Sequence, residues 1–144
     1  MAAKIGTDFK FWPNIVGTLL GGGQQAALAA HPLLSDSLTG TGGNADQVQI
    51  AQVISRLKVH SDLQLHAALE QIEWRKYLAP RASSDLMDWQ QMREMRASGL
   101  VEIGSHTCTH SRLTRLTSQA ELQHEIVFLL GCHPPLCLLA RISP

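Results

Sequence analysis

The sequence lacks the charge pattern of a protein that binds nucleic acid or a membrane surface. Lysine and arginine together number 12, aspartate and glutamate also number 12, and the formal net charge is zero at pH 7. It contains no basic run and no basic stretch with interleaved aromatic residues. Because such binding depends on clustered positive charge, we expect neither nucleic acid nor a membrane among the partners.

Cysteine and long apolar runs are also scarce. The 3 cysteines are an odd number, and their spacing does not form a disulfide framework. The apolar stretch 126–142 is interrupted by Gly131 and by Pro134 and Pro135, whereas a membrane-spanning helix needs about 20 mostly apolar residues. The first residues lack the charged-then-apolar order of a signal peptide, so a cytoplasmic location is the default expectation.

Helical patterns fill the first half of the chain, whose 144 residues suit one small domain. Residues 50–57 and 65–72 each place apolar side chains at the spacing of one helical face. Asn44 and Gln47 have the spacing of a capping box at the start of the first of these helices. We therefore predict a mostly helical segment over residues 1–80.

A helix and then a strand are predicted after residue 87. Asp88 is suited to cap the helix, with Gln91 three residues on, and Gly99 is placed to end it in a left-handed conformation. Residues 100–103 then alternate between apolar and polar side chains, which is typical of a strand. A helix that leads into a strand favours an α/β fold.

A pair of histidines follows this strand. His106 and His110 stand four residues apart, and residues at that spacing share one face of a strand as well as of a helix. Two imidazoles on the same face can bind one divalent metal ion. The spacing therefore makes His106 and His110 candidate ligands of one metal ion.

The segment that holds this pair, Ser105-His-Thr-Cys-Thr-His110, resembles the second signature motif of the polysaccharide deacetylase family, carbohydrate esterase family four. The preceding helix and the continuation to about residue 127 are similar to that family as well. The resemblance implies an α/β fold, here a fragment of an irregular (β/α) barrel. On this hypothesis residues 1–80 are a mostly helical insertion, residues 81–127 are a piece of the barrel core with the histidine motif, and residues 128–144 are an atypical tail.

The resemblance also implies a chemistry, the hydrolysis of acetyl groups on a polysaccharide or oligosaccharide by a metal-dependent enzyme. Zinc is the expected metal for His106 and His110, although cobalt or nickel suits the same ligands. In the family, the third ligand and the general base are aspartates of a Thr-Phe-Asp-Asp-Gly motif. This chain contains no Asp-Asp pair. We therefore assign it no catalytic residue and no organic cofactor site, and we expect it to be inactive alone.

Two other functions stay open. The helical segment carries apolar stripes and no reactive groups, which also suits a non-catalytic helical interaction module. A related barrel hydrolase that cleaves small amides would share the histidine motif. Trp12 is the tryptophan we consider for stacking on sugar rings, because it lies beside Pro13. The sequence indicates no oligomeric state.

Overall fold

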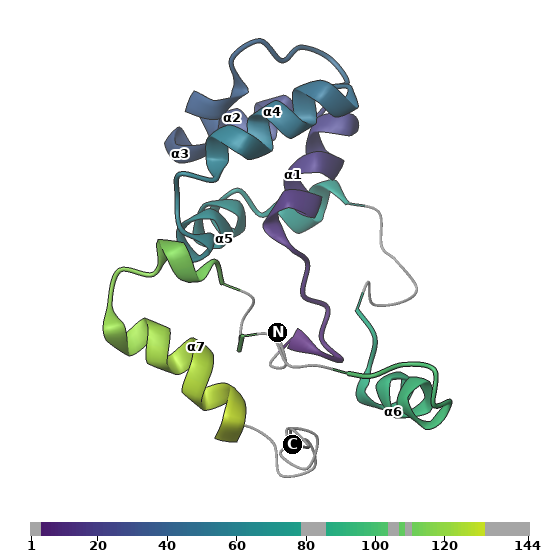
Figure 1. Ribbon diagram of the computed structural model, residues 1–144. Helices are drawn as coiled ribbons and strands as arrows, with labels where there is room; N and C mark the ends of the chain where they lie inside the picture. Colours follow the sequence, from purple (N-terminus) through teal and green to yellow (C-terminus); the bar gives the residue numbers. More distant parts are fainter. Residues whose placement is uncertain (1–3, 79–85, 104–106, 109–110, 132–144) are drawn as a thin grey trace. The chain divides into compact units, whose positions relative to one another are not determined.

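The structure is a computed structural model that describes residues 4–78, 86–103, 107–108 and 111–131 (Figure 1). The predicted atypical tail lies outside these residues from position 132 onward. The chain divides into two compact units, Lys10–Ala82 and a second unit that joins Met1–Phe9 to Ser83–Pro144. Each unit is held together by its own contacts.

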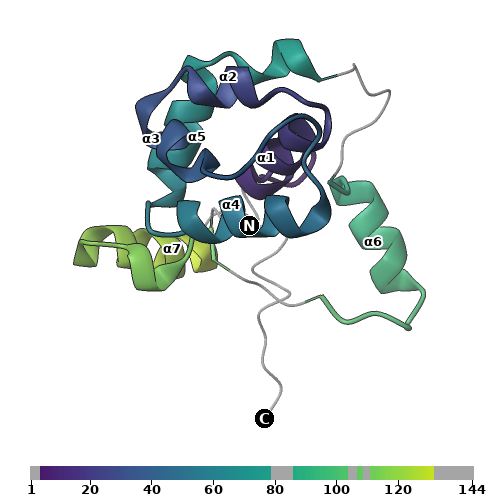
Figure 2. The same cartoon turned by 90° about the horizontal axis from the view of Figure 1, so that it is seen from above.

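The unit Lys10–Ala82, called the helical unit from here on, is a bundle of short helices. Helix α1 contacts both α4 and α5, and Figure 2 shows these helices gathered with α2 and α3 around a common centre. The connecting helix α2 contacts α1, α3 contacts α5, and the 3-10 helix η2 contacts α4. The elements are α1 Trp12–Gly21, α2 Gln25–Ala29, α3 Pro32–Ser35, η2 Asp36–Leu38, α4 Gln47–Leu57, α5 Asp62–Gln71 and the 3-10 helix η3 Trp74–Tyr77.

The core of the helical unit follows the apolar stripes of the sequence. The predicted helical faces at 50–57 and 65–72 are confirmed, because they coincide with α4 and α5 and their apolar residues belong to or pack against the core. Burying one large aliphatic side chain stabilises a fold by about 1.5–3 kcal/mol. The fully buried aliphatic residues are Ile15, Val16, Leu19, Leu20, Leu28, Leu34, Val53, Leu57, Leu65 and Leu69.

Capping boxes fix the starts of α4 and α5. Asp46 accepts a hydrogen bond from the backbone N–H of Gln49 at 2.8 Å, and the side chain of Gln49 accepts one from the backbone N–H of Asp46 at 3.0 Å. Ser61 caps α5 in the same way. The predicted capping box of Asn44 and Gln47 is wrong by two residues, because the extended backbone that precedes α4 is at Asp46.

Replacing Asp46 with alanine is expected to lower the free energy of unfolding of the helical unit by about 1 kcal/mol, because the first turn of α4 loses a hydrogen-bond acceptor. Asp46→Asn keeps an acceptor at that position and should stay close to the wild type. Urea unfolding, followed by the fluorescence of the buried Trp12 and Trp74, compares the two variants. An equal loss in both variants, or none in the alanine variant, would contradict the capping role.

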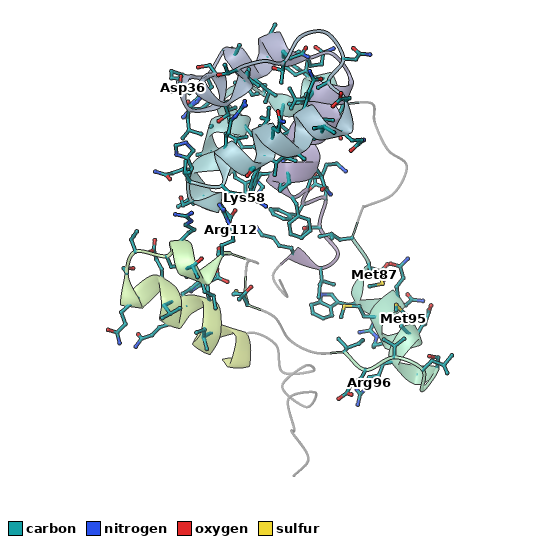
Figure 3. All side chains as sticks on the ribbon, turned by 45° about the horizontal axis from the view of Figure 1, so that its top comes forward. Asp36, Lys58, Met87, Met95, Arg96 and Arg112 are labelled. Carbon is teal, nitrogen blue, oxygen red and sulfur yellow. The ribbon has the colours of Figure 1, made fainter. Side chains whose placement is uncertain are left out.

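The second unit contains one helix whose ends agree with the sequence prediction. Asp88 accepts hydrogen bonds from two first-turn N–H groups at 2.8 Å, and Gly99 has a φ of 71° just after the helix. No residue of this helix is buried, and Met95 within it and Met87 just before it are exposed (Figure 3). The elements of the unit are α6 Trp89–Ala97, the 3-10 helix η4 Leu113–Arg115 and α7 Gln119–Gly131.

The predicted α/β fold is wrong for the part of the chain that the structure describes, since that part contains helices and no strand. A fragment of a (β/α) barrel is therefore not what the described residues form. The predicted strand at 100–103 has no regular secondary structure, and the side chain of Leu100 is 90% exposed. Alternation becomes a strand only where a neighbouring strand completes the hydrogen-bonded ladder, and the described residues offer none.

The described helices are short compared with a membrane span. None of them, within the residues that the structure describes, has both the length and the apolar character needed to cross a bilayer. The longest described helix, α7, has 13 residues, whereas a span takes about 20.

Candidate metal centre

The predicted metal ligands His106 and His110 lie outside the described residues. Between them the structure describes Thr107 and Cys108, which are 7% and 3% exposed. The middle of the histidine motif is therefore covered by other parts of the protein. The residues that contact Thr107 and Cys108 form the surroundings of this part of the motif.

Thr107 has an unusual backbone conformation. Its φ is 44°, in the left-handed region that a β-branched residue seldom adopts. A residue held in that region costs about 1–3 kcal/mol and persists only where the surrounding structure requires it, which is often at functional sites. This strained residue lies inside the histidine motif, directly after His106 in the sequence.

Helix α7 contacts the middle of the motif through a backbone hydrogen bond. The N–H of Cys108 donates to the carbonyl oxygen of Glu125, with an N···O distance of 3.1 Å. Glu125 is 4% exposed, so its side chain is buried together with Thr107 and Cys108. A buried carboxyl group therefore lies on the turn of α7 that touches the motif.

Reciprocal hydrogen bonds fix the start of α7. Glu121 accepts hydrogen bonds from the backbone N–H groups of Thr117 and Ser118 at 3.1 Å each, and the Ser118 hydroxyl accepts one from the backbone N–H of Glu121 at 3.1 Å. The bonds from Thr117 and Ser118 hold the pKa of Glu121 below its ordinary value. Because the start of α7 is fixed, the position of Glu125 about one turn further on is fixed as well.

The tryptophan considered for sugar stacking belongs to the core of the helical unit. Trp12 is 5% exposed, and its indole N–H donates to the carboxylate of Asp62 at 2.6 Å. Trp74 is 3% exposed, and its indole N–H donates to Glu70 at 2.9 Å. Since a sugar needs an accessible ring face, the stacking interpretation of Trp12 is wrong.

The donor chemistry of the histidine motif fits a divalent transition metal. Within the described ranges, no group of three histidine, cysteine or acidic side chains is placed to hold a metal ion. The fit therefore rests on the histidine pair, whose two imidazoles are ligands that zinc, cobalt and nickel accept. Of the described residues of the motif, Cys108 contacts α7 through the backbone of Glu125, which is buried.

Sequence reasoning did not single out Glu125. In the sequence it stands three residues after Leu122 and directly before Ile126, so an acidic side chain interrupts an apolar pattern of α7. Acidic side chains are almost never fully buried unless they are paired. An acidic residue placed among the apolar residues of a helix is the sequence signal that could have identified Glu125 as buried.

Comparison with known proteins agrees with the resemblance of the histidine motif. The model of the polysaccharide deacetylase family matches residues 48–127, which is more than half of the chain. The match contains the histidine motif, and it begins within α4. Neither a curated protein nor a solved structure matches the chain. The chain therefore belongs to the polysaccharide deacetylase family, and its matched segment is a deacetylase-like hydrolase domain.

Proposed function

We propose that this chain supplies the metal-binding histidines of a metal-dependent deacetylase that acts on an acetylated polysaccharide or oligosaccharide. The observation that carries the proposal is the family match over residues 48–127, which includes both histidines. His106 and His110 are the proposed ligands, each through an imidazole nitrogen. Zinc is the proposed metal, with cobalt and nickel as ions that the same ligands accept.

A divalent metal ion bound by these residues supplies Lewis-acid chemistry, which polarises an acetyl carbonyl and promotes its hydrolysis. The task of His106 and His110 is to hold and orient that ion. The strained Thr107 and the hydrogen bond from Cys108 to α7 support this proposal, because they restrain the backbone between the two histidines. A well-restrained loop keeps ligands in place at a smaller entropic cost.

We do not expect this chain alone to catalyse the hydrolysis of acetyl groups. Catalytic zinc sites usually have three protein ligands, and hydrolysis also needs a group that moves protons. The chain has no Asp-Asp pair that would match the family's ligand and base. We therefore expect metal binding without measurable release of acetate from an acetylated chitooligosaccharide.

Zinc titration by calorimetry tests the proposal. The unaltered chain is expected to bind zinc, and the His106→Ala/His110→Ala double variant is expected to lose that binding, because both nitrogen ligands are gone. The His60→Ala/His66→Ala double variant removes the same number of imidazoles from the helical unit and should bind like the unaltered chain. Equal zinc affinity of the two double variants would contradict the proposal that His106 and His110 bind the metal.

A second candidate function is a non-catalytic helical interaction module. The observation in its favour is the helical unit, which has its own apolar core and whose sequence carries no reactive pattern. This function predicts cooperative unfolding that zinc does not affect. Zinc binding that depends on His106 and His110 would show that the chain does more than a helical interaction module.

A further inference from the structure

Helix α6 has 9 residues, and none of them is buried. A helix of this length is marginally stable by itself in water, and most of the stability of short helices in proteins comes from an apolar face that packs against another surface. Met95 is 38% exposed, and Trp89 and Met92 are half-buried. The apolar side of α6 therefore keeps surface that another molecule can cover.

Five residues at and within the start and end of α6 share one side of the helix, called the α6 face from here on. Trp89, Met92 and Met95 follow one another at steps of three residues, and residues at that spacing are neighbours on a helix surface. Asp88 and Arg96 are exposed and stand four residues before and after Met92, so they lie on the same side. The α6 face is thus apolar in the middle, acidic at its first end and basic at its last end.

This order of charges makes the α6 face complementary to itself in the antiparallel direction. When two copies of α6 lie antiparallel with Met92 beside Met92, Asp88 of each copy lies beside Arg96 of the other. Trp89 of each copy then lies beside Met95 of the other, so apolar side chains meet between the two charge pairs. The same patch serves on both copies, as a two-fold symmetric interface requires. Both capping bonds of Asp88 are made by Oδ1, which leaves Oδ2 able to accept a bond from the partner.

We propose that the α6 face binds a second copy of this chain, and that two copies pair through antiparallel α6 helices. The charge complementarity of the face selects this partner and this direction, because a parallel pair would place like charges side by side at both ends. Two helices of 9 residues are too short to bury the roughly 1,200–2,000 Å² of a stable complex. The pair therefore forms at high protein concentration and separates on dilution. The proposed function and its metal play no part in this inference.

Sedimentation velocity of the full chain over a series of concentrations tests the proposal. The unaltered chain is expected to shift from monomer toward dimer as its concentration rises. Met92→Glu should weaken this association by about tenfold or more, because it places two carboxylates beside each other on the symmetry axis. Met87→Glu is the matched control, since Met87 is 48% exposed but stands five residues before Met92 and outside the α6 face. It should associate like the unaltered chain.

Arg96→Gln tests the direction of the two helices. In the antiparallel pair this variant loses a charge pair at each end, so its association should be about 2-fold to 10-fold weaker at low salt. In a parallel pair it would remove a repulsion between two arginines and tighten the association. Added salt should weaken the association of the unaltered chain more than that of Arg96→Gln, because salt screens exposed charge pairs. Unchanged or tighter association of Arg96→Gln at low salt overturns the proposal.

The remaining outcomes also decide. A chain that stays monomeric at every concentration overturns the proposal. Association that Met92→Glu leaves unchanged overturns it as well, because a different surface then joins the copies. Circular dichroism of each variant shows whether its helices are retained. Should Met92→Glu fail to fold, Arg96→Gln decides, since it replaces an exposed side chain outside the apolar middle of the α6 face.

Discussion

Replacing Leu65 with alanine is expected to lower the free energy of unfolding of the helical unit by about 2–5 kcal/mol. Leu65 is 0% exposed and lies on α5 within the core cluster that also holds residues of α1 and α4. The alanine variant loses the burial of the removed carbon atoms and leaves a cavity that the surrounding helices fill only in part. A small domain has a total stability of about 5–15 kcal/mol, so this loss is a large fraction of it.

Leu63 provides the matched control for Leu65. It lies on the same helix, two residues earlier, and it is 77% exposed. Leu63→Ala should therefore change the free energy of unfolding by no more than about 0.5 kcal/mol. Urea unfolding followed by tryptophan fluorescence compares the two variants. Similar losses in both would show that α5 does not present the face to the core that the structure gives it.

Replacing Trp12 with alanine is expected to destabilise the helical unit by about 3–5 kcal/mol. Trp12 is 5% exposed and joins α1 to α5, because its indole N–H donates to Asp62 at 2.6 Å. The variant loses a large buried aromatic ring, and it leaves the carboxylate of Asp62 without this donor. The hydrogen bond accounts for part of the loss, since a bond to a charged group contributes about 1.5–3 kcal/mol.

Trp12→Phe separates the burial of the ring from the hydrogen bond. Phenylalanine keeps most of the apolar contact but has no N–H, so we expect a loss smaller than that of Trp12→Ala and near the value of the hydrogen bond, about 1.5–3 kcal/mol. Asp62→Asn in the Trp12→Phe background should then have little additional effect through this pair. Urea unfolding followed by circular dichroism measures all three variants. Equal losses in Trp12→Phe and Trp12→Ala would assign the whole effect to the hydrogen bond and contradict the core role of the ring.

The helices were the predictable part of the fold, because their signals are local. The apolar spacing of residues 50–57 and 65–72 identified α4 and α5, and Asp88 and Gly99 marked the limits of α6. The strand at 100–103 was not predictable in this way. Alternation over four residues is a short-range pattern, whereas a strand depends on a partner that no local pattern supplies.

The candidate site was predictable only as far as its motif. His106 and His110 were identified by their spacing and by the family resemblance, and they stay predictions because they lie outside the described residues. Glu125 was missed because its burial results from the contact of α7 with Cys108, which joins residues 17 positions apart. The interpretation of Trp12 was wrong for a related reason, since a large ring beside a proline can face a ligand or the core, and only packing decides between them.

The family match starts at residue 48, inside α4, yet α4 shares its core with helices that precede it. The apolar faces of α4 and α5 are covered by buried residues of α1, which are Ile15, Val16, Leu19 and Leu20. A chain trimmed to the matched segment would present those faces to water, and uncovered apolar surface of this extent favours self-association. The segment that matches the family and the segment that packs into one core therefore have different limits in this protein. A shortened version of the chain that keeps this core must include α1 as well as α4 and α5.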